Sequence, residues 1–314
     1  MAAALSLAER GVGRTGENPS VGCIIVKQGH VVGRGWTQVG GRPHAEAMAL
    51  QQAGLEARES TIYVTLEPCA HISQRGPACA KLLVEARPAK VVIALQDPDP
   101  RTAGDGMASL RAAGIEVVTD VMATEARRNL AGFLSRINNS RPYVTLKLAT
   151  SLDGQIAMAD GSSRWITSDI ARAHSHVERT RCDAILVGAG TVLADNPQLN
   201  VRLAGLEAMH PRKVILGSSD APTGWEVIRT PQDIAGLGCN NLLVEGGAAT
   251  ASAFLRAGLV DRLLLYRAPI LIGAGKACLT DIGLAQIADA HGRWQLLDSR
   301  YLGKDRLEVY QSAN

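Results

Sequence analysis

The sequence has few aromatic residues, no long apolar run and no concentration of positive charge. Aromatic residues make up 4% of the 314 positions, and the net charge of +3 is spread along the chain. Because nucleic-acid surfaces combine basic clusters with stacking aromatic rings, we expect no nucleic-acid partner. No stretch approaches the roughly 18 apolar residues of a membrane span, so we expect no membrane partner either.

Two further features that the sequence lacks, a secretory signal and a disulfide framework, bear on the cellular compartment of the protein. The first residues, MAAALSLAERGVGRTG, lack the basic segment and apolar segment of a secretory signal. Six cysteines in a chain of this length, without an export signal, indicate reduced thiols or metal ligands rather than a disulfide framework. We therefore expect a cytoplasmic protein.

Strand and helix signals alternate twice along the chain, which predicts two α/β domains. In the first half we predict strands over 21–26, 30–36, 61–66, 90–95 and 115–118, and helices over 44–54, 77–86, 107–113 and 122–137. In the second half we predict strands over 143–150, 183–188, 213–217, 241–247, 262–271 and 306–310, and helices over 169–181 and 248–257. The polar segment 138–142 ends in proline and separates a domain of residues 1–141 from one of residues 142–314.

One histidine, one glutamate and two cysteines stand at predicted element boundaries. His44 opens a helix two residues before Glu46, Cys69 follows a strand, and Cys79 lies at the start of a helix. One imidazole and two thiolates form a tetrahedral zinc shell with one position open for water, which is typical of a catalytic site. Zinc lowers the pKa of that water towards ~7, and Glu46 is placed to move its proton. Histidine-x-glutamate followed by proline-cysteine is a signature of zinc deaminases, so we predict hydrolytic deamination of an amino-pyrimidine-like ring.

The spacing of the two cysteines departs from that signature, because nine residues separate them instead of two. Taken singly, a cysteine here fits a core thiol, and His44 fits a helix-start histidine. Their combination at the right element boundaries favours zinc. His71 is an alternative ligand, but the strand-end and helix-start positions favour Cys79.

Longer motifs resemble a known family, the bifunctional deaminase–reductases of riboflavin biosynthesis. In the first half they are NPSVG (18–22), PHAE (43–46), VTLEPCAH (64–71) and QDPDP (96–100). In the second half they are KLATSLDG (147–154), WITS (165–168), GTVLADNP (190–197) and EGG (245–247). The resemblance covers nearly the whole chain, and the wide cysteine spacing is usual in this family.

The resemblance implies a cytidine-deaminase-like α/β/α domain followed by a dihydrofolate-reductase-like α/β domain. The first would use one zinc ion per chain to deaminate 2,5-diamino-6-ribosylamino-4(3H)-pyrimidinone 5′-phosphate. The second would use NADPH to reduce 5-amino-6-(5-phosphoribosylamino)uracil to its ribityl product. The implied partners are small phosphoribosyl pyrimidines and further copies of the chain, in a dimer or a larger homo-oligomer.

For the second domain, the residues themselves indicate a nucleotide site. Glu245, Gly246 and Gly247 follow an apolar strand and precede a helix, whose free N–H groups suit a phosphate. The resemblance adds cofactor contacts at Ala149, Trp165, Thr191, Asp195, Ser218, Gly247, Ala248, Ala249, Thr250, Ala251, Ser252 and Ala253. It adds substrate contacts at Asn18 in the first domain and at Ser163, Arg179, Leu199, Arg202 and Glu245 in the second. Lys147 and Asp195 are candidates to orient or protonate the opening ribose, because hydride delivery needs a proton source.

Two departures from the family leave alternatives open. The segment from Leu203 to Asn241 is short, and Gly217 stands where an aspartate is expected before Ser218. The preference for NADPH over NADH is therefore open, and one alternative is a protein with deaminase activity only. Two other classes are a deaminase that acts on a flipped tRNA base and a non-catalytic module stabilised by zinc. The first would have the short cysteine spacing and a basic surface.

Overall fold

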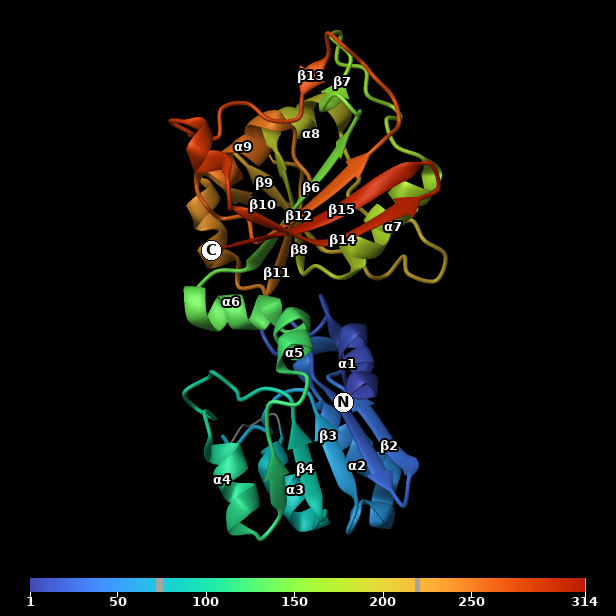
Figure 1. Cartoon of the computed structure of the whole chain (residues 1–314), viewed down its shortest axis with the longest axis vertical. Coiled ribbons are helices and arrows are strands. Elements are labelled where there is room, and N and C mark those ends of the chain that lie inside the picture. Colours follow the sequence, from blue (N-terminus) through green and yellow to red (C-terminus); the bar gives the residue numbers. More distant parts are fainter. Residues whose placement is uncertain (72–75, 218–220, 314) are drawn as a thin grey trace. The chain divides into compact units, whose positions relative to one another are not determined.

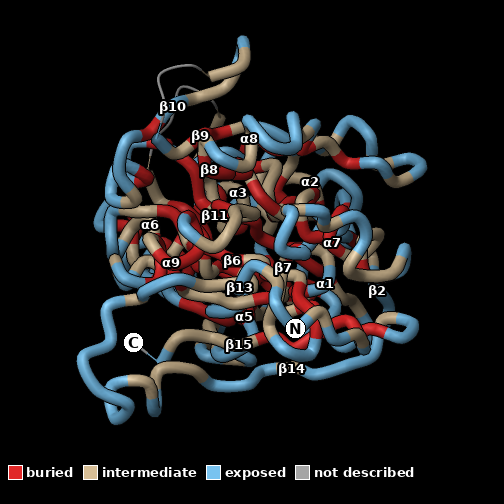
Figure 2. Tube along the Cα trace, turned by 90° about the horizontal axis from the view of Figure 1, so that it is seen from above, coloured by how far each residue is buried: buried red, intermediate tan, exposed pale blue. Residues whose placement is uncertain are grey.

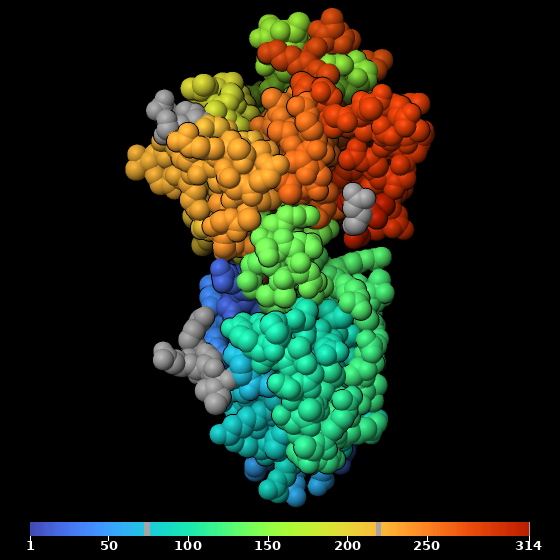
Figure 3. Space-filling view, turned by 90° about the vertical axis from the view of Figure 1, so that its left-hand side faces the viewer, coloured from blue at the N-terminus to red at the C-terminus, as the bar shows by residue number. Residues whose placement is uncertain are grey.

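The computed structural model describes residues 1–71, 76–217 and 221–313. The chain divides into two compact units, Met1–Ser140 and Arg141–Asn314. Each unit is continuous in sequence, so each has its own range of colours in Figures 1 and 3. Among the described helices, none has both the length and the apolar character needed to cross a membrane.

A five-stranded sheet forms the centre of the first unit, in the order β2-β1-β3-β4-β5 (Figure 1). Its strands are β1 (Gly22–Lys27), β2 (His30–Trp36), β3 (Thr61–Val64), β4 (Lys90–Ile93) and β5 (Glu116–Val118). Strand β1 pairs antiparallel with β2 and β3, whereas β3, β4 and β5 are parallel. The strands predicted over 21–26 and 30–36 are confirmed, and they pair as the hairpin β1–β2.

Helices cover both faces of this sheet. The helices of the unit are α1 (Ala2–Ala8), η1 (Glu9–Gly11), η2 (Val39–Gly41), α2 (Ala45–Ala53), η3 (Gly54–Ala57), α3 (Cys79–Ala86), α4 (Asp105–Ala112), α5 (Ala123–Asn129) and α6 (Ala131–Asn139). A Cβ on Gly22 would collide with the carbonyl of Ala4 in α1, and one on Gly35 with the carbonyl of Ala45 in α2. Gly35 pairs with Cys23, the neighbour of Gly22, and successive strand residues face opposite ways, so α1 and α2 lie on opposite faces.

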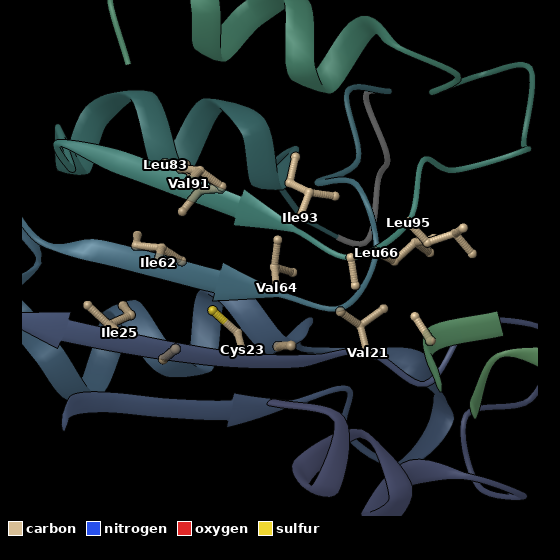
Figure 4. Close-up of a cluster of buried hydrophobic side chains, with 14 of the residues drawn as sticks. Val21, Cys23, Ile25, Ile62, Val64, Leu66, Leu83, Val91, Ile93 and Leu95 are labelled. Atoms are coloured by element: carbon tan, nitrogen blue, oxygen red, sulfur yellow. The ribbon is translucent and has the colours of Figure 1, made fainter. Parts of the chain in front are cut away.

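Buried apolar side chains fix the strand ends from which the first site is built. Figure 4 shows those of Val21, Cys23, Ile25, Ile62, Val64, Leu66, Leu83, Val91, Ile93 and Leu95 gathered around β1, β3 and β4. All ten are buried. The segments that follow β3 and β4 therefore leave the sheet from rigid positions.

The prediction of a single helix over 122–137 is wrong, because the structure has two helices there. Helices α5 and α6 are separated by Leu130, whose φ of −94° and ψ of 9° leave helical geometry. The two axes point in different directions (Figure 1). Periodicity reports which side chains are buried, not the direction of the axis, so it did not reveal the bend.

An eight-stranded sheet forms the centre of the second unit, in the order β10-β9-β8-β11-β6-β12-β15-β14. Its strands are β6 (Tyr143–Thr150), β8 (Ala184–Gly188), β9 (Arg212–Leu216), β10 (Glu226–Ile228), β11 (Asn241–Val244), β12 (Arg262–Arg267), β14 (Trp294–Leu302) and β15 (Asp305–Ser312). The strands from β10 to β12 are parallel, and β15 and β14 are added antiparallel. The strand predicted over 262–271 ends at Arg267, because Pro269 cannot continue the ladder.

Helices α7 (Asp169–Thr180), α8 (Ala189–Asp195) and α9 (Ala248–Arg256) accompany this sheet. The unit also has η4 (Pro231–Leu237), η5 (Ile287–Ala290) and a two-stranded sheet of β7 (Gln155–Ala157) and β13 (Lys276–Ala277). Buried positions, red in Figure 2, follow β8 and β11 in the middle of the large sheet. Strands β6, β8, β9 and β11 are parallel, so their C-terminal ends share one edge, where ligand sites form in such sheets.

Candidate active sites

Three predicted metal ligands meet in the first unit. His44 is the N-cap of α2, Cys69 lies in the loop after β3, and Cys79 is the first residue of α3. Their ligand atoms lie within 4.8 Å of one another. His44 Nδ1 is 3.3 Å from Cys79 Sγ and 3.6 Å from Cys69 Sγ. One imidazole nitrogen and two buried thiols at this spacing fit a zinc ion and leave its fourth position free.

The two sulfurs are electrostatically different. The pKa of Cys69 is lowered, chiefly because the Cys79 side chain donates a hydrogen bond to its sulfur. The main-chain N–H of Cys79 donates a second one, at 3.3 Å. Cys69 is therefore held as a thiolate, the form that binds metals.

Glu46 lies in the first turn of α2, directly beside this group. Its side chain is buried beside that of Cys79, with 3% of the residue exposed. Burial raises the pKa of Glu46. A carboxyl group at this position reaches the reacting end of the site and can both accept and donate a proton.

Glu67 has a supporting role that the motif did not reveal. Its carboxylate accepts hydrogen bonds from the main-chain N–H groups of Asp97, Gly104 and Met107, at 3.0 to 3.2 Å. These bonds tie the QDPDP segment to the residue two positions before Cys69. The signal available in the sequence was a glutamate directly before the proline-cysteine pair, which by itself does not distinguish a supporting residue from a reacting one.

Asn18 lies near the first site, but it does not line the cavity that His44 and Cys79 border. It is half-buried, donates through Nδ2 to the carbonyl of Thr15 at 3.2 Å, and packs against Gly41. Gly41 is three residues before His44. A direct substrate contact by Asn18 stays a prediction.

A cavity of about 780 Å³ opens at the C-terminal edge of the eight-stranded sheet in the second unit. Most of the residues expected from the resemblance line it: Lys147, Ala149, Ser163, Trp165, Thr191, Asp195, Glu245, Gly247, Ala248, Ala249 and Thr250. Sequence reasoning missed Ile156, Gly161, Arg172, Gly188 and Lys276, which also line it. They come from α7, from the last residue of β8 and from the strands β7 and β13 with their flanking turns, which carry no motif of their own.

Charged side chains form a connected group at the base of this cavity. Arg179 donates to both carboxylate oxygens of Glu245, at 2.7 and 2.9 Å, and to the carbonyl of Asn200 at 2.8 Å. Lys147 Nζ lies 3.8 Å from the same carboxylate. Although burial raises the pKa of Glu245, the charges of Arg179 and Lys147 lower it to about 2. Glu245 is therefore ionised throughout the physiological range.

Several expected contacts do not lie on this cavity. Ala251 is buried in the core between α9 and the sheet, and Ser252 is buried and accepts a hydrogen bond from the main-chain N–H of Thr280. Ala253 does not line the cavity. Leu199 is 3% exposed and packs with Cys182 and Val187 in the core.

The two predicted phosphate arginines are also placed elsewhere. Arg179 lies beneath Glu245, engaged as described above. Arg202 is exposed and lines a separate groove with His210 and Lys213. Ser218 lies outside the described residues.

Comparison with known proteins covers both units. The family model for the cytidine and deoxycytidylate deaminase zinc-binding region matches residues 1–95. The model for the RibD C-terminal domain matches residues 142–235 and 232–307. These two matches confirm the predicted order of a deaminase-like and a reductase-like α/β domain.

Whole-chain relatives give the same result. The riboflavin biosynthesis protein RibD of Escherichia coli K12 is 39% identical, over 97% of this chain and 96% of its own length. That of Mycobacterium tuberculosis H37Rv is 42% identical, over 94% of this chain and 91% of its own length. The structure of Acinetobacter baumannii RibD superimposes with a TM-score of 0.91 at 36% identity and covers 100% of this chain and 98% of that one. A deaminase/reductase from Thermotoga maritima gives 0.90 at 31% identity, covering 100% of this chain and 97% of that one. Similarity over the full length argues against the alternative of deaminase activity alone.

Proposed function

The chain belongs to the bifunctional deaminase–reductase family of riboflavin biosynthesis, and from that premise we propose how its own residues perform the two reactions. The protein is a zinc-dependent deaminase joined to an NADPH-dependent reductase. We propose that the deaminase substrate is 2,5-diamino-6-ribosylamino-4(3H)-pyrimidinone 5′-phosphate. The reductase substrate is then the product, 5-amino-6-(5-phosphoribosylamino)uracil, the compound that the Thermotoga maritima relative is named for reducing.

In the first unit, His44, Cys69 and Cys79 would hold the zinc ion. When bound, zinc supplies a Lewis acid that makes water nucleophilic at neutral pH. Glu46 is the proton carrier: its carboxylate takes one proton from the attacking water and delivers it to the ring nitrogen. It then takes the second proton from the new hydroxyl group on the ring carbon and delivers it to the amine, which departs as ammonia. The observation that supports this role is the burial of Glu46 against Cys79, inside the ligand group.

In the second unit, the large cavity would hold NADPH and the phosphoribosyl substrate. The nicotinamide supplies a hydride when bound, and opening of the ribose ring leaves negative charge on an oxygen atom. Lys147 is the proton donor we favour, because its ammonium faces the cavity and is held by Glu245. Asp195 lines the cavity at the end of α8 and would orient the substrate. Arg179 is a positioning residue for Glu245 rather than a direct phosphate ligand in this arrangement.

The observation that carries the function is the presence of a His-Cys-Cys group and a reductase cavity on one chain. The test is a coupled assay with the purified full-length protein, the diaminopyrimidine phosphate and NADPH. We expect about one zinc per chain, deamination without NADPH, and NADPH oxidation only after deamination. Oxidation of NADPH with the undeaminated compound would overturn the proposed order. The homo-oligomer and the cytoplasmic location stay predictions.

A further inference from the structure

A buried carboxylate of the second unit has no part in the mechanism above. Asp305 is the first residue of β15, and its side chain is buried, with 0% of the residue exposed. Its Oδ2 accepts two hydrogen bonds from Ser168, one from the main-chain N–H at 2.6 Å and one from the hydroxyl group at 2.5 Å. Ser168 and Asp305 are 137 residues apart in sequence, so this contact joins two distant segments of the chain.

Stability alone does not account for this carboxylate. Its second oxygen, Oδ1, is buried and has no hydrogen-bond partner among the described residues. Burial of a carboxylate with incomplete hydrogen bonding costs free energy, and an apolar side chain of similar size would avoid that cost. The contact of Asp305 therefore acts mainly on geometry, because it fixes where Ser168 lies.

Ser168 joins the wall of the reductase cavity to helix α7. It is the N-cap of α7, and the three residues before it, Trp165, Ile166 and Thr167, line the cavity. Asp305 itself does not line that cavity. A change at position 305 would therefore reach a ligand in the cavity through the segment 165–168.

The direction of the Trp165 side chain depends on this anchored segment. Trp165 is 64% exposed, so core packing does not hold its indole ring. The guanidinium of Arg172, on α7, lies 4.4 Å from the centroid of the ring and donates to the carbonyl of Thr167 at 2.5 Å. The position of Arg172 depends in turn on the start of α7, which Asp305 holds through Ser168. Asp305 thus supports the indole both along the chain and through Arg172.

We propose that Asp305 is a positioning residue of the reductase: through Ser168 it fixes the orientation of Trp165, and thereby the affinity of the cavity for NADPH. This inference rests on the proposed contact between NADPH and Trp165. A wall that is already in place lets the cofactor bind without first ordering the segment, so loss of the anchor weakens binding. Deamination in the first unit should be unaffected.

The experiment measures the dissociation constant of NADPH by fluorescence titration of the full-length protein. For Asp305→Ala we expect Kd to rise about 10-fold, the size of one lost hydrogen bond to a charged group, with kcat at saturating NADPH within a few-fold. Asp305→Asn keeps an oxygen that accepts from Ser168, so its Kd should stay near that of the wild type. Asp298→Ala is the matched control, because Asp298 lies on the neighbouring strand β14, pairs with Arg300 and should leave Kd unchanged.

A double-mutant cycle with Trp165→Ala separates positioning from a general loss of structure. Once the indole is absent, Asp305→Ala should change Kd by less than about twofold, whereas a structural defect would raise Kd by the same factor in both backgrounds. If Asp305→Ala does not fold, Ser168→Ala takes its place in the cycle, because it removes only the hydroxyl donor. Its Kd should rise about 3-fold with Trp165 present and stay unchanged with Trp165 absent.

Three results would overturn the inference and leave the reductase function intact. They are an unchanged Kd for the folded anchor variant, an equal rise with and without Trp165, and normal NADPH binding by Trp165→Ala, which would remove the proposed cofactor contact. If the wild type did not bind NADPH at all, the proposed reductase function itself would fail, and this inference with it.

Discussion

Arg179 and Glu245 form a two-point ion pair beneath the reductase cavity, with Nε–Oε1 at 2.7 Å and Nη2–Oε2 at 2.9 Å. Both side chains are largely buried, at 12% and 9% exposure. The pair joins α7 to the end of β11 and so fixes the carboxylate that Lys147 faces. The first prediction follows from this contact.

Replacement of Arg179 by glutamine should destabilise the second unit by about 3 kcal/mol, because it leaves the buried Glu245 carboxylate without its strongest partner. It should also weaken reduction while leaving deamination unchanged. Denaturant unfolding and the two separate activity assays measure these effects. The control is Arg256→Gln, which breaks an exposed pair with Asp281 and should change stability by less than about 1 kcal/mol. Equal effects of the two variants would contradict the prediction.

Replacement of Glu46 by glutamine should lower the deamination rate by about 10²- to 10⁴-fold, the range for loss of a general acid/base. The amide of glutamine keeps the shape of the side chain, and position 46 is not one of the proposed zinc ligands. The zinc content should therefore remain near one per chain. NADPH oxidation should be unchanged when the deaminated substrate is supplied. A variant that keeps zinc and deaminates normally would contradict the assignment.

Replacement of Cys69 or Cys79 by serine should remove zinc, because serine lacks the thiolate that binds it. Deamination should fall to background, and reduction of supplied deaminated substrate should persist. Metal analysis by atomic absorption and both assays test this. Cys278→Ser is the control, since Cys278 is half-exposed in the second unit and should keep both zinc and activity. If a serine variant at position 79 retained zinc, His71 would return as the ligand.

The sequence was most informative for site residues whose position depends on local chemistry. His44, Glu46, Cys69 and Cys79 could be predicted because each stands at an element boundary that sequence patterns also reveal. The wide cysteine spacing departs from the signature, and it separates this family from deaminases of nucleic acids. In the structure, Gly76 and Pro77, which lie between the two cysteines in sequence, line a cavity together with His44 and Cys79.

The reductase side was harder to predict, because its contacts depend on tertiary packing. Arg179 was expected to hold a phosphate, but its partner Glu245 lies on another element, 66 residues away in sequence. Leu199 matched a motif position, yet its side chain belongs to the core. Lys276 faces the cavity from β13, a two-residue strand that no periodicity could reveal. Motif matching gave positions in the sequence and could not give the direction of each side chain.

The stability of the second unit should depend on His176 in mildly acidic solution. This side chain is buried, and its Nδ1 accepts the main-chain N–H of Arg202 at 3.3 Å. Burial, with the charges of Arg179 and Arg202, lowers the pKa of His176 to about 4. The unfolded chain binds this proton near pH 6.5, so the free energy of unfolding should fall as the pH drops from about 6.5 to 4.

His176→Gln keeps a hydrogen-bond acceptor that does not titrate, so the pH dependence of unfolding in this window should become shallower. Denaturant titrations at several pH values measure the slope. His291→Gln removes an exposed histidine and should leave the slope as in the wild type. Parallel slopes for the wild type and His176→Gln would show that another group titrates.

Lys147 gives the last prediction, because its role can be separated from that of its neighbours. Methionine at this position keeps the length of the side chain and removes both the charge and the proton. It should leave NADPH binding close to normal, since the cofactor contacts proposed at Trp165, Thr191 and the start of α9 are untouched. The rate of NADPH oxidation should fall by about 10²- to 10⁴-fold, as for loss of a general acid. Fluorescence titration with NADPH and single-turnover kinetics separate binding from chemistry. Loss of NADPH binding with an unchanged hydride-transfer rate would assign Lys147 to the cofactor instead, and would leave Asp195 as the candidate proton donor.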